Sequence, residues 1–201
     1  MPSLPPNPVS EWSEYYQSTL SKPLHPLFST LEPHLPPTGQ AIDLGCGVGH
    51  AVKWLAEKGW SVVAVDGHEM ALQIVQSRLS EDEQTRVETR LSMLEEAVIE
   101  PGRYDLVIAA YSLFFIESKE RLGEVWERIL ERLKPGGLFL FELLGPRDDW
   151  ADQLLTHTRE ELEALLTGLE VLHLEEAEQD GHTSQGIAKH WHVYHVIARK
   201  N

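Results

Sequence analysis

Residues 41–50 read AIDLGCGVGH, and this stretch decides the fold class. An apolar run that contains Asp43 is followed by three glycines at alternate positions, Gly45, Gly47 and Gly49. A glycine-rich turn directly after a strand lets the backbone approach a ligand closely, and it aims the N-terminus of the next helix at negative charge. The stretch therefore predicts a strand, a ligand-binding loop and a helix, in that order.

The segments around this loop alternate between strand-like and helical patterns. Strand-like runs occupy residues 40–45, 61–66, 86–92, 104–112 and 138–144. Helical spacing occupies residues 50–59, 68–79, 119–133 and 158–168. Because most of the strand-like runs are apolar throughout, they indicate a parallel sheet with helices on both faces. Two last runs, 169–178 and 189–200, have a glycine-containing loop and no helix between them, which predicts an antiparallel pair.

The fold class expected from this order is α/β. We predict a Rossmann-like, seven-stranded, mostly parallel sheet with helices on both faces and a C-terminal antiparallel strand pair. Local signals support several element ends: Gly59 suits the position after a helix, and Thr158 with Glu161 has the pattern of a capping box. The KPGG sequence at 134–137 is interpreted as a stop and a turn before the fifth strand.

Residues 1–39 differ in composition from the rest of the chain, since nine of the twelve prolines lie there. Proline lacks the N–H that sheets and helix interiors require, so this segment is expected to be a lead-in with short helices. One helix is predicted at 11–20 with Ser10 as its N-cap, and another around 26–35. The remaining residues, 40–201, form the main domain.

Composition and charge exclude several classes of partner. The 201 residues carry a formal net charge of -15, which repels phosphate backbones, so nucleic acid is not an expected partner. No apolar run approaches the roughly 20 residues that span a bilayer. The N-terminus lacks the pattern of a secretory signal, and Cys46 is the single cysteine. These features favour a cytoplasmic protein without a membrane partner.

The chemistry around the glycines selects between two kinds of ligand. A dinucleotide fingerprint has the spacing G-x-G-x-x-G, whereas this loop reads G-x-G-x-G with His50 at the place of the third glycine. Asp43 before the loop is unfavourable for a pyrophosphate and suits an ammonium or sulfonium group. Asp66 ends the next strand, where a carboxylate can bind both hydroxyls of a ribose. The pocket fits an adenosine linked to a cationic amino acid, as in S-adenosylmethionine.

Several motifs of this sequence, in the same order, resemble those of one protein family. DLGCGVGH (43–50) resembles the first motif of class I S-adenosylmethionine-dependent methyltransferases, and Asp66 matches the acidic residue that ends their second strand. YDLVIAAYSLFFI (104–116) resembles their fourth strand and the loop after it, and LKPGGLFLFE (133–142) their approach to the fifth. The small size and the tail KHWHVYHVIARK look like the branch related to tellurite-resistance methyltransferases.

The resemblance implies a function and a set of site residues. It implies transfer of a methyl group from S-adenosylmethionine to a small-molecule acceptor, with S-adenosylhomocysteine as product, in a monomer or homodimer. The cofactor would contact the glycine loop, the ends of the following strands and one lead-in tyrosine: Asp43, Gly45, Cys46, Gly47, Gly49, Asp66, Gly67, His68, Ser92, Met93, Leu94, Ala109, Tyr111 and Tyr16. Ser92 stands where family members often have an aspartate that binds the adenine amino group.

The lead-in helix has two interpretations. Its aromatic residues, Trp12, Tyr15 and Tyr16, either dock on the core or belong to a lid over the cofactor, with Tyr16 or Tyr15 near the cofactor carboxylate. Two functions from other classes also stay open. They are a non-catalytic S-adenosylmethionine-binding sensor or partner protein and a nicotinamide-dependent oxidoreductase, against which the G-x-G-x-G spacing and Asp43 argue.

The catalytic candidates are Tyr111, His190 and His192. Because the last strand is expected to run antiparallel, its first residues lie at the ligand edge of the sheet, where His190, Trp191 and His192 could reach the acceptor. The two histidines lack an evident third ligand, so no metal site is predicted. His195 is interpreted as packed, and Trp150 after the fifth strand as a candidate for the acceptor side.

Overall fold

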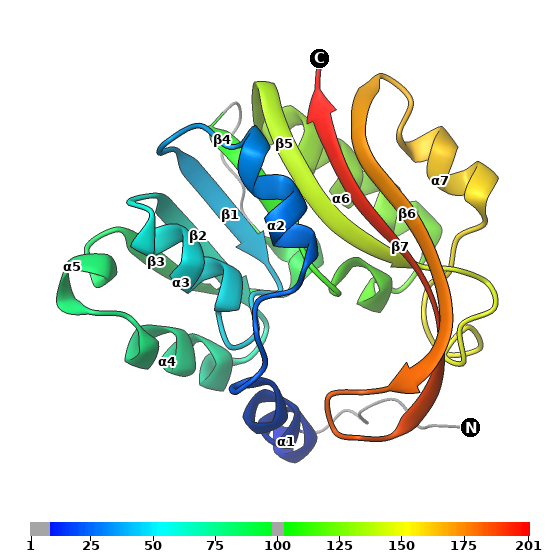
Figure 1. Ribbon diagram of the computed structural model, residues 1–201, viewed down its shortest axis with the longest axis horizontal. Coiled ribbons are helices and arrows are strands. Elements are labelled where there is room, and N and C mark those ends of the chain that lie inside the picture. The colour runs from blue at the N-terminus through cyan, green and yellow to red at the C-terminus, as the bar shows by residue number, and fades with distance from the viewer. Residues whose placement is uncertain (1–8, 98–102) are drawn as a thin grey trace.

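The computed structural model describes residues 9–97 and 103–201, and within these residues seven strands form one sheet (Figure 1). The strand order is β3-β2-β1-β4-β5-β7-β6. The strands are β1 (Gln40–Leu44), β2 (Ser61–Asp66), β3 (Val87–Leu91), β4 (Tyr104–Ala109), β5 (Leu133–Leu144), β6 (Leu169–His182) and β7 (Ala188–Lys200). The first five are parallel, and β7 is antiparallel to both β5 and β6, which confirms the predicted fold class.

Helices cover both faces of the sheet (Figure 1). They are α1 (Val9–Thr19), α2 (Leu27–Leu31), α3 (His50–Glu57), α4 (Glu69–Arg78), α5 (Glu81–Gln84), α6 (Lys119–Arg132) and α7 (Arg159–Leu165). Three short 3-10 helices are η1 (Glu32–His34), η2 (Leu94–Glu96) and η3 (Leu113–Phe115). Buried residues of α2, α3 and α4 form one core with alternate strand residues, and those of α6 and α7 form another with the remaining ones.

The side chains of each strand alternate between the two faces of the sheet and so contribute to both cores. Ile42 and Leu44 of β1 belong to the α6–α7 core, whereas Ala41 belongs to the core under α2 and α3. Because successive side chains of a strand point to opposite faces, a strand that is apolar throughout fills both cores at once. This explains why the pattern of continuous apolar runs predicted a doubly covered sheet.

Three details of the sequence prediction were wrong. α1 begins at Val9, so Ser10 lies inside the helix and is not its N-cap. The KPGG residues at 134–137 lie inside β5, where the pairing passes from Tyr104↔Leu133 to Leu106↔Leu138. These four residues stand opposite the single residue Asp105 as an irregularity of the pairing, in which Gly136 adopts a left-handed φ of 77°. Residues 134–137 therefore belong to the strand, whereas the prediction placed them in a turn before it.

The third difference is the length of the C-terminal hairpin. β6 and β7 stay paired as far as His182↔Ala188, so the loop predicted at 179–188 shrinks to 183–187. The polar residues of this part had suggested a loop. β6 is an edge strand, however, and an exposed edge accepts polar and charged side chains.

α1 and the tip of the β6–β7 hairpin lie side by side at one end of the sheet (Figure 1). A hydrogen bond of 3.2 Å joins Ser18 Oγ of α1 to Ser184 Oγ of the hairpin loop. The carboxyl ends of β1 and β4 point toward the same end (Figure 1). In open α/β sheets this is the edge at which ligands bind, next to the point between β1 and β4 where the strand order reverses. Among the described residues, no helix has the length and apolar character needed to cross a membrane.

His157, after the long loop that follows β5, is expected to make stability depend on pH. Its residue is 4% exposed, Nδ1 has no hydrogen-bond partner, and burial lowers its pKa to about 4. The unfolded chain binds this proton near pH 6.5 and the folded chain only near pH 4, so the free energy of unfolding falls as the pH drops through this window.

The variant His157→Gln should lack this dependence. Between pH 7 and pH 5 the free energy of unfolding should decrease in both proteins, and the decrease should be about 2 kcal/mol smaller for the variant than for the wild type. Urea unfolding at each pH measures the difference. The same substitution at the exposed His34 is the control and should leave the wild-type pH dependence unchanged. Equal pH slopes for His157→Gln and the wild type would contradict the prediction.

Candidate functional site

The three glycines of the loop after β1 have different roles. A Cβ atom on Gly45 would lie 2.6 Å from Ser112 Cβ, and one on Gly49 would lie 2.6 Å from Val75 Cγ2. All three have left-handed φ angles, 79°, 51° and 73° in chain order. A Cβ on Gly47 would meet no atom within 4 Å. Gly45 and Gly49 therefore let neighbouring segments pack, and Gly47 leaves open space for a ligand.

Asp66 connects this loop to the end of β2. Its Oδ2 accepts a hydrogen bond of 2.9 Å from Gly47 N, and its Oδ1 accepts one of 3.0 Å from His68 N. The hydroxyl of Tyr16 in α1 donates to Oδ1 at 3.2 Å. Burial raises the pKa of Asp66, while these hydrogen bonds oppose the rise. The carboxylate is thus held in a fixed orientation between the loop and α1.

Asp43 is a second buried carboxyl group beside the same loop. Burial, together with the negative charges of Asp66 and Glu142, raises its pKa to about 7. A cationic group close to this carboxyl would favour its charged form. The electrostatics of the loop therefore suit a ligand with a positive charge better than a phosphate.

A cavity of about 480 Å³ opens next to the loop. It is bounded by the glycine loop, by the segment that joins α1 to α2 and by the β6–β7 hairpin. Residues of the predicted cofactor set that line it are Asp43, Gly45, Cys46, Gly47 and Tyr111. Tyr15 and His50 line it as well. The cavity has the size and position of a ligand site at the carboxyl edge of the sheet.

His50 lines this cavity and joins the loop to neighbouring helices. Its Nε2 lies 2.9 Å from Thr19 O at the end of α1, and its Nδ1 lies 3.2 Å from a guanidinium nitrogen of Arg78. Arg78 also donates to Val48 O inside the loop. These contacts agree with the interpretation of His50 as a residue that stabilises the loop.

The other predicted cofactor residues lie outside the wall of this cavity. Gly49 packs on α4, and Ala109 is buried in the α6–α7 core, so the next residue, Ala110, lines the cavity in its place. The side chain of Met93 is 56% exposed, and its Sδ lies 2.8 Å from the position of a Cβ on Gly67. A ligand held by Asp66 would have Met93 at this edge.

Ser92 and Leu94 flank Met93. Ser92 N donates to Asp66 O at 3.0 Å, and Ser92 Oγ donates to Met93 O at 2.9 Å. Leu94 packs partly against the α6–α7 core. The Ser92 hydroxyl donates within its own loop, and its role in adenine binding stays a prediction.

α1 covers the end of β2 with its aromatic side chains. Tyr16 is buried on Asp66, and Trp12 stacks against His68 with ring centroids 5.3 Å apart. Tyr15, on an adjacent part of the helix, lines the cavity. Burial raises the pKa values of both tyrosines, so they are neutral hydroxyl donors. The docked helix is shown, and its movement as a lid stays a prediction.

A second, smaller cavity of about 160 Å³ adjoins the first and has mainly aromatic walls. Its aromatic residues are Trp12, Tyr15, Tyr111, Phe114, Phe115, Trp150 and Trp191. Tyr15, Tyr111 and Trp191 line both cavities. Tyr111 has a left-handed φ of 52°, a strained conformation that is common at functional sites. Trp150 lines this aromatic cavity, and its contact with an acceptor stays a prediction.

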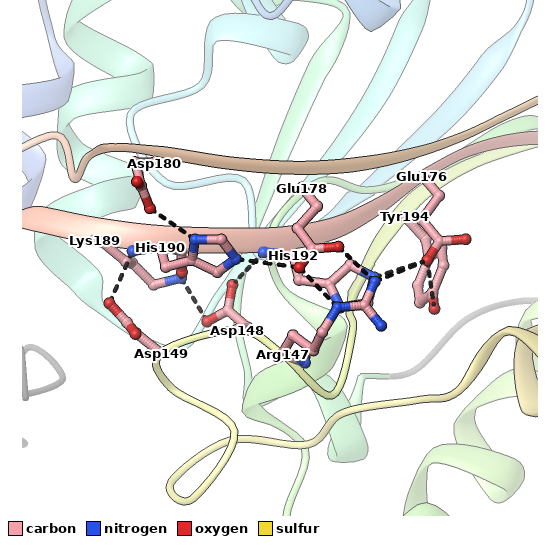
Figure 2. Close-up of polar contacts among 10 residues, drawn as sticks. All are labelled: Arg147, Asp148, Asp149, Glu176, Glu178, Asp180, Lys189, His190, His192 and Tyr194. Carbon is pink, nitrogen blue, oxygen red and sulfur yellow. Dashed lines mark hydrogen bonds and ion pairs between the residues drawn. The ribbon is translucent and has the colours of Figure 1, made fainter.

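The expectation that His190 and His192 reach the ligand cavity is wrong, although Trp191 between them does line it. Both histidines point to the opposite face of β7, where Figure 2 shows them among charged side chains. His190 contacts Asp180 at 2.7 Å, and the buried His192 contacts Glu176 at 2.9 Å. The physical reason is the alternation of a strand, which places even-numbered residues here on one face and odd-numbered ones on the other.

The KHWH sequence fastens the loop after β5 to β7 (Figure 2). Lys189 forms an ion pair with Asp148, and both side chains are 0% exposed. The Lys189 ammonium also lies 4.3 Å from the ring centroid of Trp150 and 3.6 Å from that of Trp191. Asp148 Oδ2 accepts from His192 N at 3.0 Å. The motif thus positions the two tryptophans of the aromatic cavity.

Two histidines that sequence reasoning did not select line the large cavity. His195 is four residues after Trp191 and therefore on the same face of β7, and His25 lies between α1 and α2. Their ring centroids are 5.2 Å apart, and the rings are stacked at 26°. The period of two along β7 could have revealed His195 once Trp191 was placed. No local pattern marks His25.

The strand order, the glycine loop after β1 and the carboxylate at the end of β2 define an α/β domain of the nucleoside-binding kind. A sequence profile of the family described as "Methyltransferase domain" matches residues 41–137. Over these residues the chain resembles methyltransferase domains, and its fold is that of solved S-adenosylmethionine-dependent methyltransferases.

Individual proteins are similar to the chain in sequence or in fold. The chain is 32% identical over 114 residues to "Putative methyltransferase YqeM" of Bacillus subtilis, a match that covers 56% of this chain and 45% of that one. TehB of Haemophilus influenzae superposes with a TM-score of 0.75 at 18% identity, over 94% of this chain and 67% of that one.

A third similar protein was solved with ligands. It is 1,6-didemethyltoxoflavin-N1-methyltransferase of Burkholderia thailandensis, with bound 1,6-didemethyltoxoflavin and S-adenosylhomocysteine. It has a TM-score of 0.66 at 22% identity, over 96% of this chain and 86% of that one. The chain spans about half the length of the curated relatives that it matches.

Proposed function

We propose that this protein transfers the methyl group of S-adenosylmethionine to a small-molecule acceptor. The observation that carries the proposal is the arrangement of Gly47, Asp43 and Asp66. The glycine leaves open space in the loop, and a buried carboxyl group lies on each side of it, at the ends of β1 and β2. This arrangement suits a ligand that has a cationic amino-acid part and a ribose.

The residues would divide the cofactor between them. The loop at Gly45 and Gly47 would hold the methionine part, with Asp43 beside its positive charge. Asp66 would accept hydrogen bonds from the ribose hydroxyls, as carboxylates at this strand end do in related α/β folds. The bound cofactor supplies an activated methyl group on its sulfonium.

The chain itself contributes alignment and shielding from water. Tyr111 lines both cavities, so an acceptor in the aromatic cavity would lie next to the cofactor space at this side chain. α1 closes the open edge through Trp12 and Tyr16. Holding two reactants in one orientation lowers the entropic part of the barrier, and a dry site favours a reaction that disperses charge.

The aromatic cavity supports a small, flat acceptor. Its volume of about 160 Å³ accommodates a single ring system, and its tryptophans offer flat faces for stacking. The similar Burkholderia enzyme holds 1,6-didemethyltoxoflavin together with S-adenosylhomocysteine. The net charge of -15 opposes a nucleic-acid acceptor.

We also propose a cytoplasmic protein that acts as a monomer or homodimer without a membrane partner.

Calorimetric titration of the purified protein tests the proposal. We expect S-adenosylmethionine and S-adenosylhomocysteine each to bind one site per chain in the micromolar range, and NADH not to bind. Incubation with S-adenosylmethionine and a panel of small aromatic alcohols, thiols and amines should then release S-adenosylhomocysteine with at least one class of acceptor. Failure of both adenosyl ligands to bind would refute the proposal.

A further inference from the structure

Glu142 on β5 is a buried carboxylate whose hydrogen bonds are incomplete. The residue is 0% exposed, and its Oε2 accepts a hydrogen bond of 3.1 Å from Tyr111 N. Its other oxygen, Oε1, is buried and has no hydrogen-bond partner. Burying a carboxylate costs several kcal/mol unless the charge is paired or coordinates a metal. The structure therefore places an incompletely hydrogen-bonded carboxyl group on β5, behind the histidines that line the ligand cavity.

Two histidines surround the free oxygen. His195 lies opposite Glu142 in the β5–β7 register, and its Nδ1, which also has no partner, lies 3.6 Å from Oε1. This distance is too long for a hydrogen bond. The ring of His25 stacks on that of His195. One ligand atom from each of the three residues lies within 4.8 Å of the other two.

We propose that His25, Glu142 and His195 bind a divalent transition-metal ion of the Zn²⁺ type at the inner end of the cavity. Two imidazoles and one carboxylate, with positions left open, are the ligand set of catalytic zinc sites. Ligand atoms about 2.0–2.1 Å from one tetrahedral zinc ion lie roughly 3.3 Å apart. The His195–Glu142 separation of 3.6 Å is close to this value, and all three ligand atoms lie within 4.8 Å of one another, so side-chain movements would complete the site.

His25 comes from outside the sheet and would be the third ligand. Leu27 N donates to His25 Nδ1 at 3.3 Å, a long hydrogen bond at the start of α2. If Nδ1 bound the metal, the metal bond would replace this weak contact. If Nε2 bound the metal, the contact of Nδ1 with Leu27 N would remain. Because α2 packs on the core through Leu27 and Phe28, the backbone at His25 is held in place. The site therefore needs no rearrangement of the main chain.

The position of the ion would give it a role in acceptor activation, which rests on the proposed function. His25 and His195 line the cavity together with Tyr111, whereas Glu142 lies behind them, so the open coordination positions face the ligand space. An acceptor O–H or S–H bound there would lose its proton to solvent more readily. Its freed electron pair would form the bond to the methyl carbon, and the electrons of the broken carbon–sulfur bond would remain on the cofactor sulfur.

Metal titration tests the site without an acceptor. Protein stripped with a chelator and then dialysed is titrated with Zn²⁺ by calorimetry and with Co²⁺ by visible absorption. We expect one ion per chain in the micromolar range or tighter, and a Co²⁺ spectrum of four- or five-coordinate type. The variants Glu142→Gln, His195→Gln and His25→Gln should each weaken Zn²⁺ binding by about tenfold or more.

The matched control is His190→Gln. His190 also has carboxylates beside it, Asp180 and Glu178, but it lies on the other face of β7. This variant should leave the Zn²⁺ affinity unchanged. Because Glu142→Gln could disturb the sheet, thermal unfolding is compared for all variants, and His25→Gln, outside the sheet, keeps the test valid if the sheet variants unfold.

The outcomes separate the metal site from the proposed function. Stoichiometric Zn²⁺ binding that the three variants lose and His190→Gln retains would support the site. Absent binding, or binding that survives all three substitutions, would overturn it and indicate a metal-free His195–Glu142 pair. S-adenosylmethionine is titrated into the same samples. If S-adenosylmethionine binds and Zn²⁺ does not, only the metal site is refuted. If Zn²⁺ binds and S-adenosylmethionine does not, only the proposed function is refuted.

Discussion

Replacement of Asp66 by asparagine is expected to weaken the binding of S-adenosylmethionine and S-adenosylhomocysteine by about tenfold or more, which corresponds to roughly 1.4 kcal/mol. The substitution removes the charge that strengthens hydrogen bonds from the ribose hydroxyls. The amide oxygen can still accept from one of the two N–H groups that Asp66 now holds, those of Gly47 and His68. The loop should therefore keep most of its conformation, so the loss measures recognition of the ligand.

The loss should be equal for both ligands, because the ribose is the part that they share and the sulfonium is the part in which they differ. Calorimetry at constant pH measures both affinities. The same chemical change at Asp152→Asn, at an exposed position in the loop after β5, is the control and should have no effect. An Asp66→Asn protein that folds normally and binds both ligands with wild-type affinity would show that this carboxylate does not hold the ribose.

Replacement of Lys189 by methionine is expected to produce the largest loss of stability, about 3–5 kcal/mol. Lys189 and Asp148 are buried together, and burial lowers the pKa of the lysine while the pair with Asp148 opposes this. Removing the ammonium leaves the Asp148 carboxylate buried with only the N–H groups of Trp150 and His192. An uncompensated buried charge is far more costly than the loss of an exposed ion pair.

Urea unfolding measures this loss, and two further variants define its origin. Arg147→Met, next to Asp148 in sequence, breaks the exposed pairs with Glu178 and should cost less than about 1 kcal/mol. The double variant Lys189→Met/Asp148→Asn removes both charges and should recover part of the stability. A Lys189→Met protein as stable as Arg147→Met would disprove the structural role that we assign to the buried pair.

Lys189→Met should also disturb the acceptor side of the site. The ammonium lies against the rings of Trp150 and Trp191, which form part of the aromatic cavity. The KHWH sequence, which suggested catalytic histidines, therefore contributes to the site through its lysine and tryptophan. Its two histidines belong to the network on the opposite face of the strand that Figure 2 shows.

Much of the fold and part of the site were predictable from local sequence. The order of strands and helices followed from apolar runs and periodicity, and glycine spacing placed a ligand loop after β1. Asp43 and Asp66 could be selected because Asp66 ends a parallel strand and Asp43 is the residue before the end of its neighbour, and such ends meet at one edge of the sheet. These features depend on residues that are close in the chain, so the sequence pattern alone carries them.

The sequence by itself thus determined the fold class, the loop and its two carboxyl groups. The tertiary structure decided which glycine borders open space, because only the positions of Ser112 and Val75 show that Gly45 and Gly49 allow close packing, whereas a Cβ on Gly47 would meet no atom within 4 Å. It also decided which residues of β7 face the cavity. Alternation along a strand is fixed by its geometry, but its phase is set by pairing with β5, where His195 lies opposite Glu142. His25 joins them from a segment far away in the chain, and such a juxtaposition exists only once the chain has folded.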